Sequence, residues 1–292
     1  MHINILFVIL KTLFIASICI FINPAMVQGQ ALNNTQEKNL RSEQENVEPQ
    51  KVEHAINEDG DRVWSLSMDT TYSSKYIWRG INLNNDPVIW PSLEFSYNGL
   101  TASIWSSIET TNYNKYENYG DTAGECTEVD LSINYSFCWQ DLEFSIGAIN
   151  YQYPNTGLDS TTELYGMISL KSFLCPTIEL YKDIEEIDGI YSCFSINHSF
   201  TEIWQLSESV CMSIDLCASI GYGSKNHNEC NYETSKATFT DYSLSLAIPV
   251  DVGDYWTITP SINYSSLLDK NIRYNMENDD NIWFSFSISL SF

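Results

Sequence analysis

Carboxylates at alternate positions of apolar segments are the residues of this chain best placed to do chemistry. On an extended backbone a carboxylate would lie on one face of the strand and its apolar neighbours on the opposite face. Carboxylates that line a water-filled passage concentrate cations and repel anions. We therefore expect cation preference from these lumen candidates: Asp69, Glu94, Asp130, Glu143, Glu179, Asp215 and Asp241. Other acidic clusters, within 109–130, 183–188 and 269–280, have an alternative role in solvating an outer surface or binding divalent ions between lipid phosphates.

Arg79 is the basic candidate, and Gly80 follows it. Glycine lets a chain turn where an extended segment ends. One role for Arg79 is a cation at the mouth of a passage, where it would meet anionic solute groups. The alternative, which we favour, is a salt bridge at the rim with a residue such as Asp86.

Catalytic motifs are missing from the sequence. It contains no G-x-S-x-G, no H-E-x-x-H and no phosphate-binding glycine loop, and no C-x-x-C that would indicate structural zinc. His198 and Ser199 are adjacent, and on a strand adjacent side chains point to opposite faces, so they cannot form a Ser–His pair. We expect no enzymatic activity, no metal and no cofactor.

Composition narrows the class of protein. Asp and Glu total 38 against 14 Lys and Arg, a formal charge of −24, and such a field repels nucleic acid. The chain is 43% hydrophobic, 13% aromatic and 18% charged, which is too apolar for a disordered protein. Seven cysteines follow residue 29, and an odd number leaves at least one unpaired; Cys126 and Cys230 are a candidate pair.

Two N-terminal segments precede the folded part. Residues 5–22 are almost uninterrupted apolar sequence, and Val27 and Gly29 occupy the positions that a signal peptidase selects. We assign 1–29 to a cleaved signal peptide, with a retained membrane anchor as the alternative. Residues 30–62 hold no aromatic residue and few apolar ones, which predicts a disordered periplasmic tail, with a short helix over 35–47 as the alternative. The third part is 63–292.

Alternation of apolar and polar residues with period two dominates this third part. In the last segment, for example, Phe284, Phe286 and Ile288 alternate with serines that follow Trp283. A strand puts each set on one face, whereas a helix would scatter both around its circumference. The pattern predicts strands over 64–78, 88–97, 100–109, 127–137, 141–152, 161–171, 175–183, 189–199, 208–222, 237–248, 255–265 and 281–292.

The length of these segments indicates a membrane. Ordinary strands have about five or six residues, whereas a strand that crosses a bilayer needs ~9–11. In hydrocarbon the sheet must close, because an open edge would leave backbone groups without hydrogen bonds. We predict an all-β fold, a transmembrane antiparallel β-barrel of about 12 strands, in the outer membrane of a Gram-negative cell. Short turns such as Asn98-Gly99 alternate with long loops; 184–188 and 200–207 depart from this alternation.

Aromatic residues gather near the ends of the predicted strands, where their rings would lie at the two bilayer interfaces. Core packing of a soluble β-protein is the alternative. The aromatic residues concerned are Trp64, Tyr97, Trp139, Tyr151, Tyr153, Tyr222, Trp256, Tyr264, Trp283 and Phe292.

The C-terminal segment, with Phe292, Leu290 and Ile288 on one face, resembles the assembly signal of outer-membrane barrels. The resemblance implies the barrel-assembly machinery as a partner, besides outer-membrane lipids.

A longer resemblance covers residues 72–106. Tyr76-Ile-Trp-Arg79-Gly80, then the proline-containing segment 86–93, then Gly99 with Trp105 are similar to the opening of the TorF-like porins. That family begins with a Y-x-x-R-G strand, a P-x-x-Q/P strand and a G-x-x-x-x-x-W strand. The resemblance implies an outer-membrane barrel with porin architecture, and it implies the fold and the membrane more strongly than a substrate.

The sequence as a whole favours a passive outer-membrane channel for small hydrophilic solutes. The alternative is a non-conducting barrel that acts as a structural or adhesin-type binding protein through its acidic outer loops.

Overall fold

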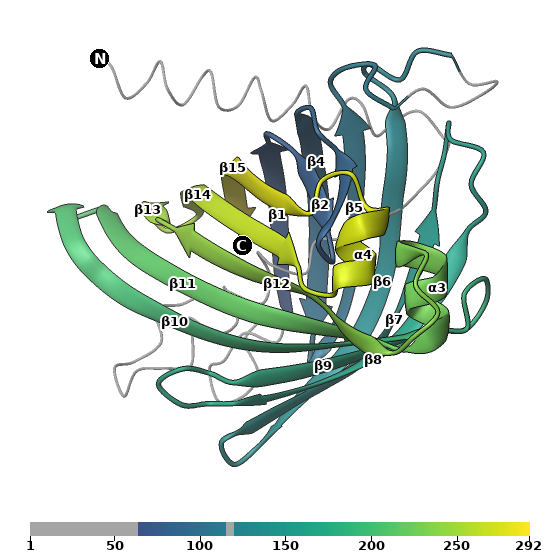
Figure 1. The fold of residues 1–292 in the computed structure, drawn as a ribbon. Coiled ribbons are helices and arrows are strands. Elements are labelled where there is room, and N and C mark those ends of the chain that lie inside the picture. Colours follow the sequence, from purple (N-terminus) through teal and green to yellow (C-terminus); the bar gives the residue numbers. More distant parts are fainter. Residues whose placement is uncertain (1–63, 115–119) are drawn as a thin grey trace.

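The computed structural model describes residues 64–114 and 120–292. The predicted signal peptide (1–29) and tail (30–62) lie outside the described residues. The described chain forms one closed antiparallel sheet of twelve strands, because β10 pairs with β11 and closes the ring (Figure 1). The segments β12 and β13 count as one strand, since both pair with β11 and β14 on either side of an interruption at Pro249. Proline has no backbone N–H to donate to the neighbouring strand.

The barrel strands have these bounds in chain order: β1 (Trp64–Ser73), β4 (Val88–Tyr97), β5 (Leu100–Glu109), β6 (Cys126–Trp139), β7 (Leu142–Gln152), β8 (Thr161–Leu170), β9 (Thr177–Asp183), β10 (Ile190–Ser207), β11 (Val210–Gly223), β12 (Thr238–Ala247), β13 (Val250–Val252), β14 (Trp256–Leu267) and β15 (Asp280–Ser291). Three described elements do not form part of the barrel wall. They are a hairpin of β2 (Tyr76–Trp78) and β3 (Ile81–Asn84) and two short helices, α3 (Lys225–Tyr232) and α4 (Lys270–Asn275).

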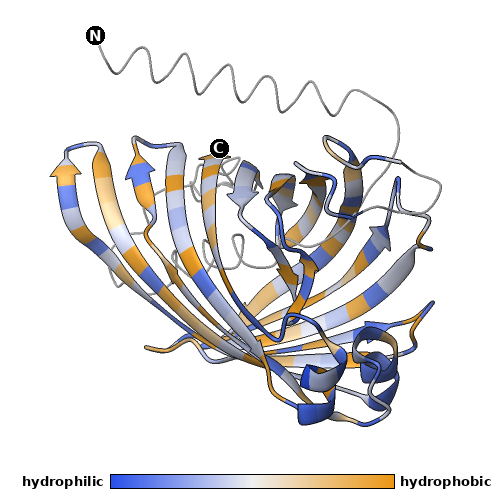
Figure 2. Cartoon of the chain, turned by 45° about the horizontal axis from the view of Figure 1, so that its top comes forward, coloured by the Kyte–Doolittle hydropathy of each residue, from blue (hydrophilic) through white to orange (hydrophobic). Residues whose placement is uncertain are grey.

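Side chains alternate between the two surfaces of the barrel, as the period-two pattern predicts. On β6, Leu131, Ile133 and Tyr135 are exposed on the outer surface, whereas Asp130 is buried. On β15, Phe284 and Phe286 are exposed while Ser287 is buried. Figure 2 shows the resulting bands of apolar and polar residues along the strands. The outer face is apolar and the inner face is polar, which is the arrangement of a barrel surrounded by lipid.

The two ends of the barrel differ. Connections 98–99, 140–141, 171–176, 208–209 and 253–255 are short and lie at one rim, which we call the short-turn rim. The first is the predicted two-residue hairpin turn, with positive φ at Asn98 and Gly99. Leu66 and Phe292 exchange backbone hydrogen bonds at this rim, so β1 and β15 meet there. Longer connections at the other rim carry the β2–β3 hairpin, α3 and α4 (Figure 1). None of the helices in 64–114 and 120–292 is long and apolar enough to cross a membrane.

Two predicted boundaries are wrong. The first strand ends at Ser73 instead of continuing to residue 78, because the chain leaves the wall and forms the β2–β3 hairpin. Residues 200–207 are not a loop but the end of β10, which pairs with β11 through a bulge between Phe200 and Trp204. The bulge includes Glu202, whose φ is positive, and it breaks the alternation by which the sequence marks a strand.

Candidate functional site in the barrel lumen

The β2–β3 hairpin reaches from one side of the lumen to the other. It leaves the wall after β1 and returns at β4. At its tip Arg79 and Gly80 both have positive φ, 47° and 82°, as a two-residue hairpin turn requires. A Cβ added at Gly80 would lie 2.7 Å from Asp241 Cβ and 2.8 Å from Leu267 Cδ2. The tip therefore packs against β12 and β14 with no room for a side chain.

Arg79 holds this tip against a further part of the wall. Its Nη1 and Nη2 donate to the two carboxylate oxygens of Glu163 on β8, at 2.8 and 2.7 Å, and the two side chains are only 5% and 6% exposed. The guanidinium carbon lies 4.3 Å from the ring centroid of Tyr191, on β10, and 4.9 Å from that of Tyr181, on β9. Trp78, beside Arg79 in the hairpin, adds a third ring at 4.6 Å. A buried bidentate pair with stacked rings is a strong and geometrically specific contact for arginine.

Electrostatics keep Arg79 charged in this position. Burial disfavours a charged guanidinium, but the Glu163 carboxylate outweighs that effect and raises the pKa of Arg79 above its ordinary value. Tyr151 on β7 donates its hydroxyl to Glu163 Oε2 at 2.7 Å, so the carboxylate is bonded by two residues. Tyr191 donates to Asp241 Oδ1 at 3.2 Å. Arg79, Glu163, Tyr151, Tyr181 and Tyr191 form what we call the lumen cluster.

Helix α3 supports the cluster from the rim. Tyr232 at its C-terminal end donates its hydroxyl to the backbone oxygen of Arg79 at 2.7 Å. His227 is buried, and burial together with the nearby Arg79 charge lowers its pKa to about 3. The ring is therefore neutral at physiological pH. It contacts the rings of Trp78 and Tyr191.

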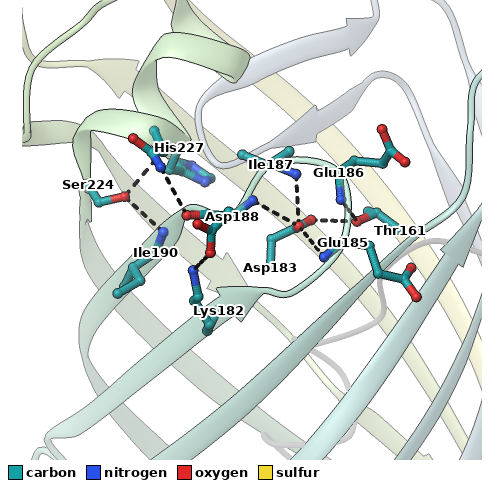
Figure 3. Close-up of polar contacts among 11 residues, drawn as sticks. Thr161, Lys182, Asp183, Glu185, Glu186, Ile187, Asp188, Ile190, Ser224 and His227 are labelled. Carbon is teal, nitrogen blue, oxygen red and sulfur yellow. Dashed lines mark hydrogen bonds and ion pairs between the residues drawn. The ribbon is translucent and has the colours of Figure 1, made fainter.

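The loop 184–189 fixes α3 to the barrel (Figure 3). Asp183 at the end of β9 accepts backbone N–H groups of residues 185, 187 and 188 and the Thr161 hydroxyl. Ser224, the N-cap of α3, accepts from the backbone N–H of His227 and of Ile190. A Cβ at Gly189 would lie 2.7 Å from the backbone of His227. Asp183 thus orders the loop, and the loop positions the helix that bonds to the hairpin.

The predicted lumen carboxylates lie on the inner face of the wall, spread over much of its circumference. Asp130 and Asp241 are buried at the level of the hairpin. Asp69 accepts the hydroxyls of Thr71 and Ser289, and Asp215 accepts that of Ser199 at 2.5 Å. Glu179 accepts from the Tyr181 hydroxyl at 3.3 Å. Glu94 and Glu143 lie opposite Ser103 and Ser169 in the register of their sheet neighbours.

Arg79 has a different environment from either predicted role. It is not a free cation at the mouth, because Glu163 occupies both of its terminal nitrogens. The predicted salt bridge of Arg79 does form, but with Glu163 inside the lumen and not with a rim residue such as Asp86, which accepts the hydroxyl of Thr111. Sequence reasoning missed Glu163, although it occupies a polar position in the alternation of β8 between Thr162 and Leu164.

Tyr151 corrects the predicted aromatic belt. It is 3% exposed and lies in the lumen, because it occupies an inner-face position opposite Asp130 on β6. Other members of the predicted belt, Tyr97 and Trp139 among them, are exposed near the short-turn rim. A tyrosine near the end of a strand can lie in the aromatic belt or in the lumen. The face of the strand that it occupies decides between these two places.

The remaining candidate chemistry is not assembled. Cys126 and Cys230 are both free thiols, so the candidate disulfide does not form in the structure. His198 Nδ1 lies 2.7 Å from the backbone oxygen of Phe173, whereas Ser199 bonds to Asp215 on the inner face. In the described part of the chain, no group of three His, Cys, Asp or Glu residues could hold a metal ion.

The fold and the lumen together define a closed, twelve-stranded β-barrel with an apolar outer face, a polar inner face and a hairpin across one mouth. Comparison with solved structures finds similar barrels at low sequence identity. A structure titled "KdgM porin" is 8% identical, with a TM-score of 0.46 over 77% of this chain and 99% of that one. The COG4313 outer membrane channel from Pseudomonas putida F1 is 8% identical, with a TM-score of 0.47 over 79% and 96%.

LpxR from Salmonella typhimurium is a third similar structure, 7% identical with a TM-score of 0.46 over 77% of this chain and 99% of that one. No family model matches the sequence, and no curated protein matches it.

Proposed function

We propose that the protein is an outer-membrane channel for passive diffusion of small hydrophilic solutes, with a preference for cations. The single observation that carries the proposal is the inner face of the barrel, where carboxylates and hydroxyls replace the apolar residues of the outer face. A barrel wall satisfies its own backbone hydrogen bonds in lipid, so polar side chains inside it serve a hydrated interior. The TorF-like resemblance of residues 72–106 and the porin structures among the similar barrels agree with this class.

Cation preference follows from the charges of that interior. The carboxylates at Asp69, Glu94, Glu179 and Asp215 are spaced along the inner face below the hairpin. The buried guanidinium of Arg79 is neutralised by Glu163. Carboxylates that line a water-filled passage raise the local concentration of positive ions and repel anions.

Reversal potentials in a planar lipid bilayer with a salt gradient test both parts of the proposal. We expect discrete conductance steps with a potential of the sign for cations, and a smaller potential for the double variant Asp69→Asn, Asp215→Asn. Glu277→Gln, in the loop beyond α4, is the matched control because it removes one acid from the long-loop rim. Anion preference in the parent protein would overturn the cation preference, and an equal loss of selectivity in the control would refute the inner carboxylates as its origin.

The alternative function also has an observation in its favour. The β2–β3 hairpin, α3 and the loop 184–189 all pack at one mouth, as expected for a non-conducting barrel that presents acidic loops to a binding partner. A variant in which a Gly-Ser linker replaces residues 76–84 separates the two functions. Folded protein that gives no conductance even without the hairpin would support the binding protein and refute the channel.

The C-terminal strand also suggests how the barrel is inserted into the outer membrane. The C-terminal strand β15 completes the barrel, since it pairs with β1 and β14 and ends in the exposed apolar residue Phe292. We propose that this strand is recognised by the barrel-assembly machinery of the outer membrane, and that membrane lipids cover the outer face.

A further inference from the structure

The β2–β3 hairpin is fixed at its tip by very few groups. Its own strands pair at three positions only, with a register shift between Tyr76 and Ile77. At its base Tyr76 is buried against Val88 and Trp105. Near its tip, Arg79 makes polar contacts through its guanidinium to Glu163 on β8 and through its backbone oxygen to Tyr232 on α3. Ile81 packs against the buried side chains of Tyr232, Leu267 and Ile272. The Arg79–Glu163 pair is therefore the charged part of the attachment of the tip.

We propose that the hairpin is a gate and that Arg79 is its latch. In the closed state described above, the guanidinium is bonded to Glu163 and the tip lies across the lumen. In the open state Arg79 leaves Glu163, and the tip moves away from β8, β9 and β12 while the base stays packed at Tyr76. This inference rests on the proposed channel function, because a gate has no role in a barrel that never conducts.

The chemistry of the latch suits a reversible closure. A buried ion pair gains electrostatic attraction, but both charges lose their hydration, so the net contribution of the pair to stability is small. Removing only one partner costs more, because the other charge then stays buried without a counter-charge. When the hairpin swings out, Arg79 and Glu163 both regain water, and the open state recovers much of what the pair loses. The apolar contact of Ile81 gains no such hydration when the tip moves, so that contact favours the closed state.

Opening also changes the charge of the lumen. In the closed state the Glu163 carboxylate is neutralised by Arg79. When Arg79 leaves with the tip, that carboxylate joins Asp130 and Asp241 on the inner face near the mouth. In the open channel Arg79 no longer neutralises the Glu163 carboxylate, and the cation preference should rise as the gate opens.

Two single substitutions separate the latch from a purely structural role. Arg79→Gln removes the latch and leaves Glu163 unpaired in the lumen. Glu163→Gln also removes the pair, but it adds no negative charge. Arg273→Gln is the matched control, because Arg273 is an arginine of α4 at the same rim that pairs with Asp279 and Asp280 instead of with Glu163.

Single-channel recording of these variants, beside the parent protein and the variant with residues 76–84 replaced by a linker, tests the inference. We expect the ratio of open to closed time to rise about tenfold or more in Arg79→Gln and Glu163→Gln, because each loses charge-assisted hydrogen bonds. Arg79→Gln should also be more cation-selective than Glu163→Gln. Arg273→Gln should behave as the parent does. Heat-modifiable migration in gels shows that each variant is folded.

The outcomes distinguish the gate from the channel. If the linker variant conducts and Arg79→Gln and Glu163→Gln keep the parent's open time, the latch is refuted while the channel stands. If Arg79→Gln and Glu163→Gln open the gate equally but have equal selectivity, the uncovering of Glu163 is refuted. If no folded variant conducts, including the one without the hairpin, the channel function itself fails.

Discussion

Replacing Gly80 by alanine should release the tip of the hairpin by steric means alone. Gly80 has a φ of +82°, and an added Cβ would lie 2.7 Å from Asp241 Cβ and 2.8 Å from Leu267 Cδ2. A left-handed backbone costs a non-glycine residue about 1–2 kcal/mol, and overpacking a closely packed site costs about 1–3 kcal/mol more. The two terms predict a loss of ~2–5 kcal/mol for the closed position of the tip.

Gly124 provides a control that isolates the contact from the backbone term. Its φ is +85°, and a Cβ added there would meet no atom within 4 Å. Gly124→Ala should therefore cost only the ~1–2 kcal/mol of backbone strain, and only in its own loop. The loss at the hairpin in Gly80→Ala, minus the loss that Gly124→Ala causes in its own loop, measures the contact of the tip with Asp241 and Leu267.

Amide hydrogen exchange of the purified barrel in detergent detects the difference. A loss of 2 kcal/mol corresponds to a ~30-fold change in an equilibrium constant, so the amides of residues 76–84 should exchange at least that much faster in Gly80→Ala than in the parent. The amides of β6 and β7 should keep their protection in both variants. Unchanged protection of the hairpin in Gly80→Ala would refute the packing of the tip against the far wall, and with it the gate.

Two further predictions concern the rim and assembly. Burial and Arg79 lower the pKa of His227 to about 3, below its ordinary value of about 6.5. A lowered histidine pKa contributes stability that is fully present above pH ~6.5 and is lost as pH falls towards 3. Between pH 7 and pH 5 the free energy that stabilises α3 against the barrel should therefore fall by about 2 kcal/mol. The loss should be seen as faster hydrogen exchange of the α3 amides, after correction for intrinsic exchange rates. His227→Gln should show no such pH dependence, and an equal response would exclude His227 as its origin. Phe292→Ser should lower the fraction of folded barrel in the outer membrane, whereas Phe173→Ser, at an exposed aromatic of the same rim, should not; equal yields would argue against Phe292 as part of an assembly signal.

Much of the barrel could be predicted from local sequence because its two faces meet different solvents. Along most of β6 and β15 apolar side chains alternate with polar ones, so the alternation indicates the strand, its length and which of its faces meets lipid. The same rule failed at the bulge around Glu202, where the alternation of side chains breaks although β10 continues to pair with β11. It failed again after Ser73, where apolar residues continue into a hairpin that packs inside the lumen instead of in the wall.

The lumen cluster shows the limit of that local information. Arg79 and Glu163 are 84 residues apart in the chain, and each has a plausible solvated role when its own segment is considered alone. Tyr151, Tyr181 and Tyr191 come from three strands whose separation is set by the pairing register, not by sequence distance. A pattern along one strand specifies which face a side chain occupies, but it contains no information about what lies across the barrel.

The sequence by itself determined the strand number, the position of seven carboxylates on the inner face and the end of the barrel that carries the long loops, because these depend on the choice between lipid and water at each residue. Only the tertiary structure decided that the β2–β3 hairpin crosses the mouth and that Arg79 meets Glu163. That contact depends on the closure of the sheet, which brings β8, β9, β10 and β12 within reach of a turn attached to β1 and β4.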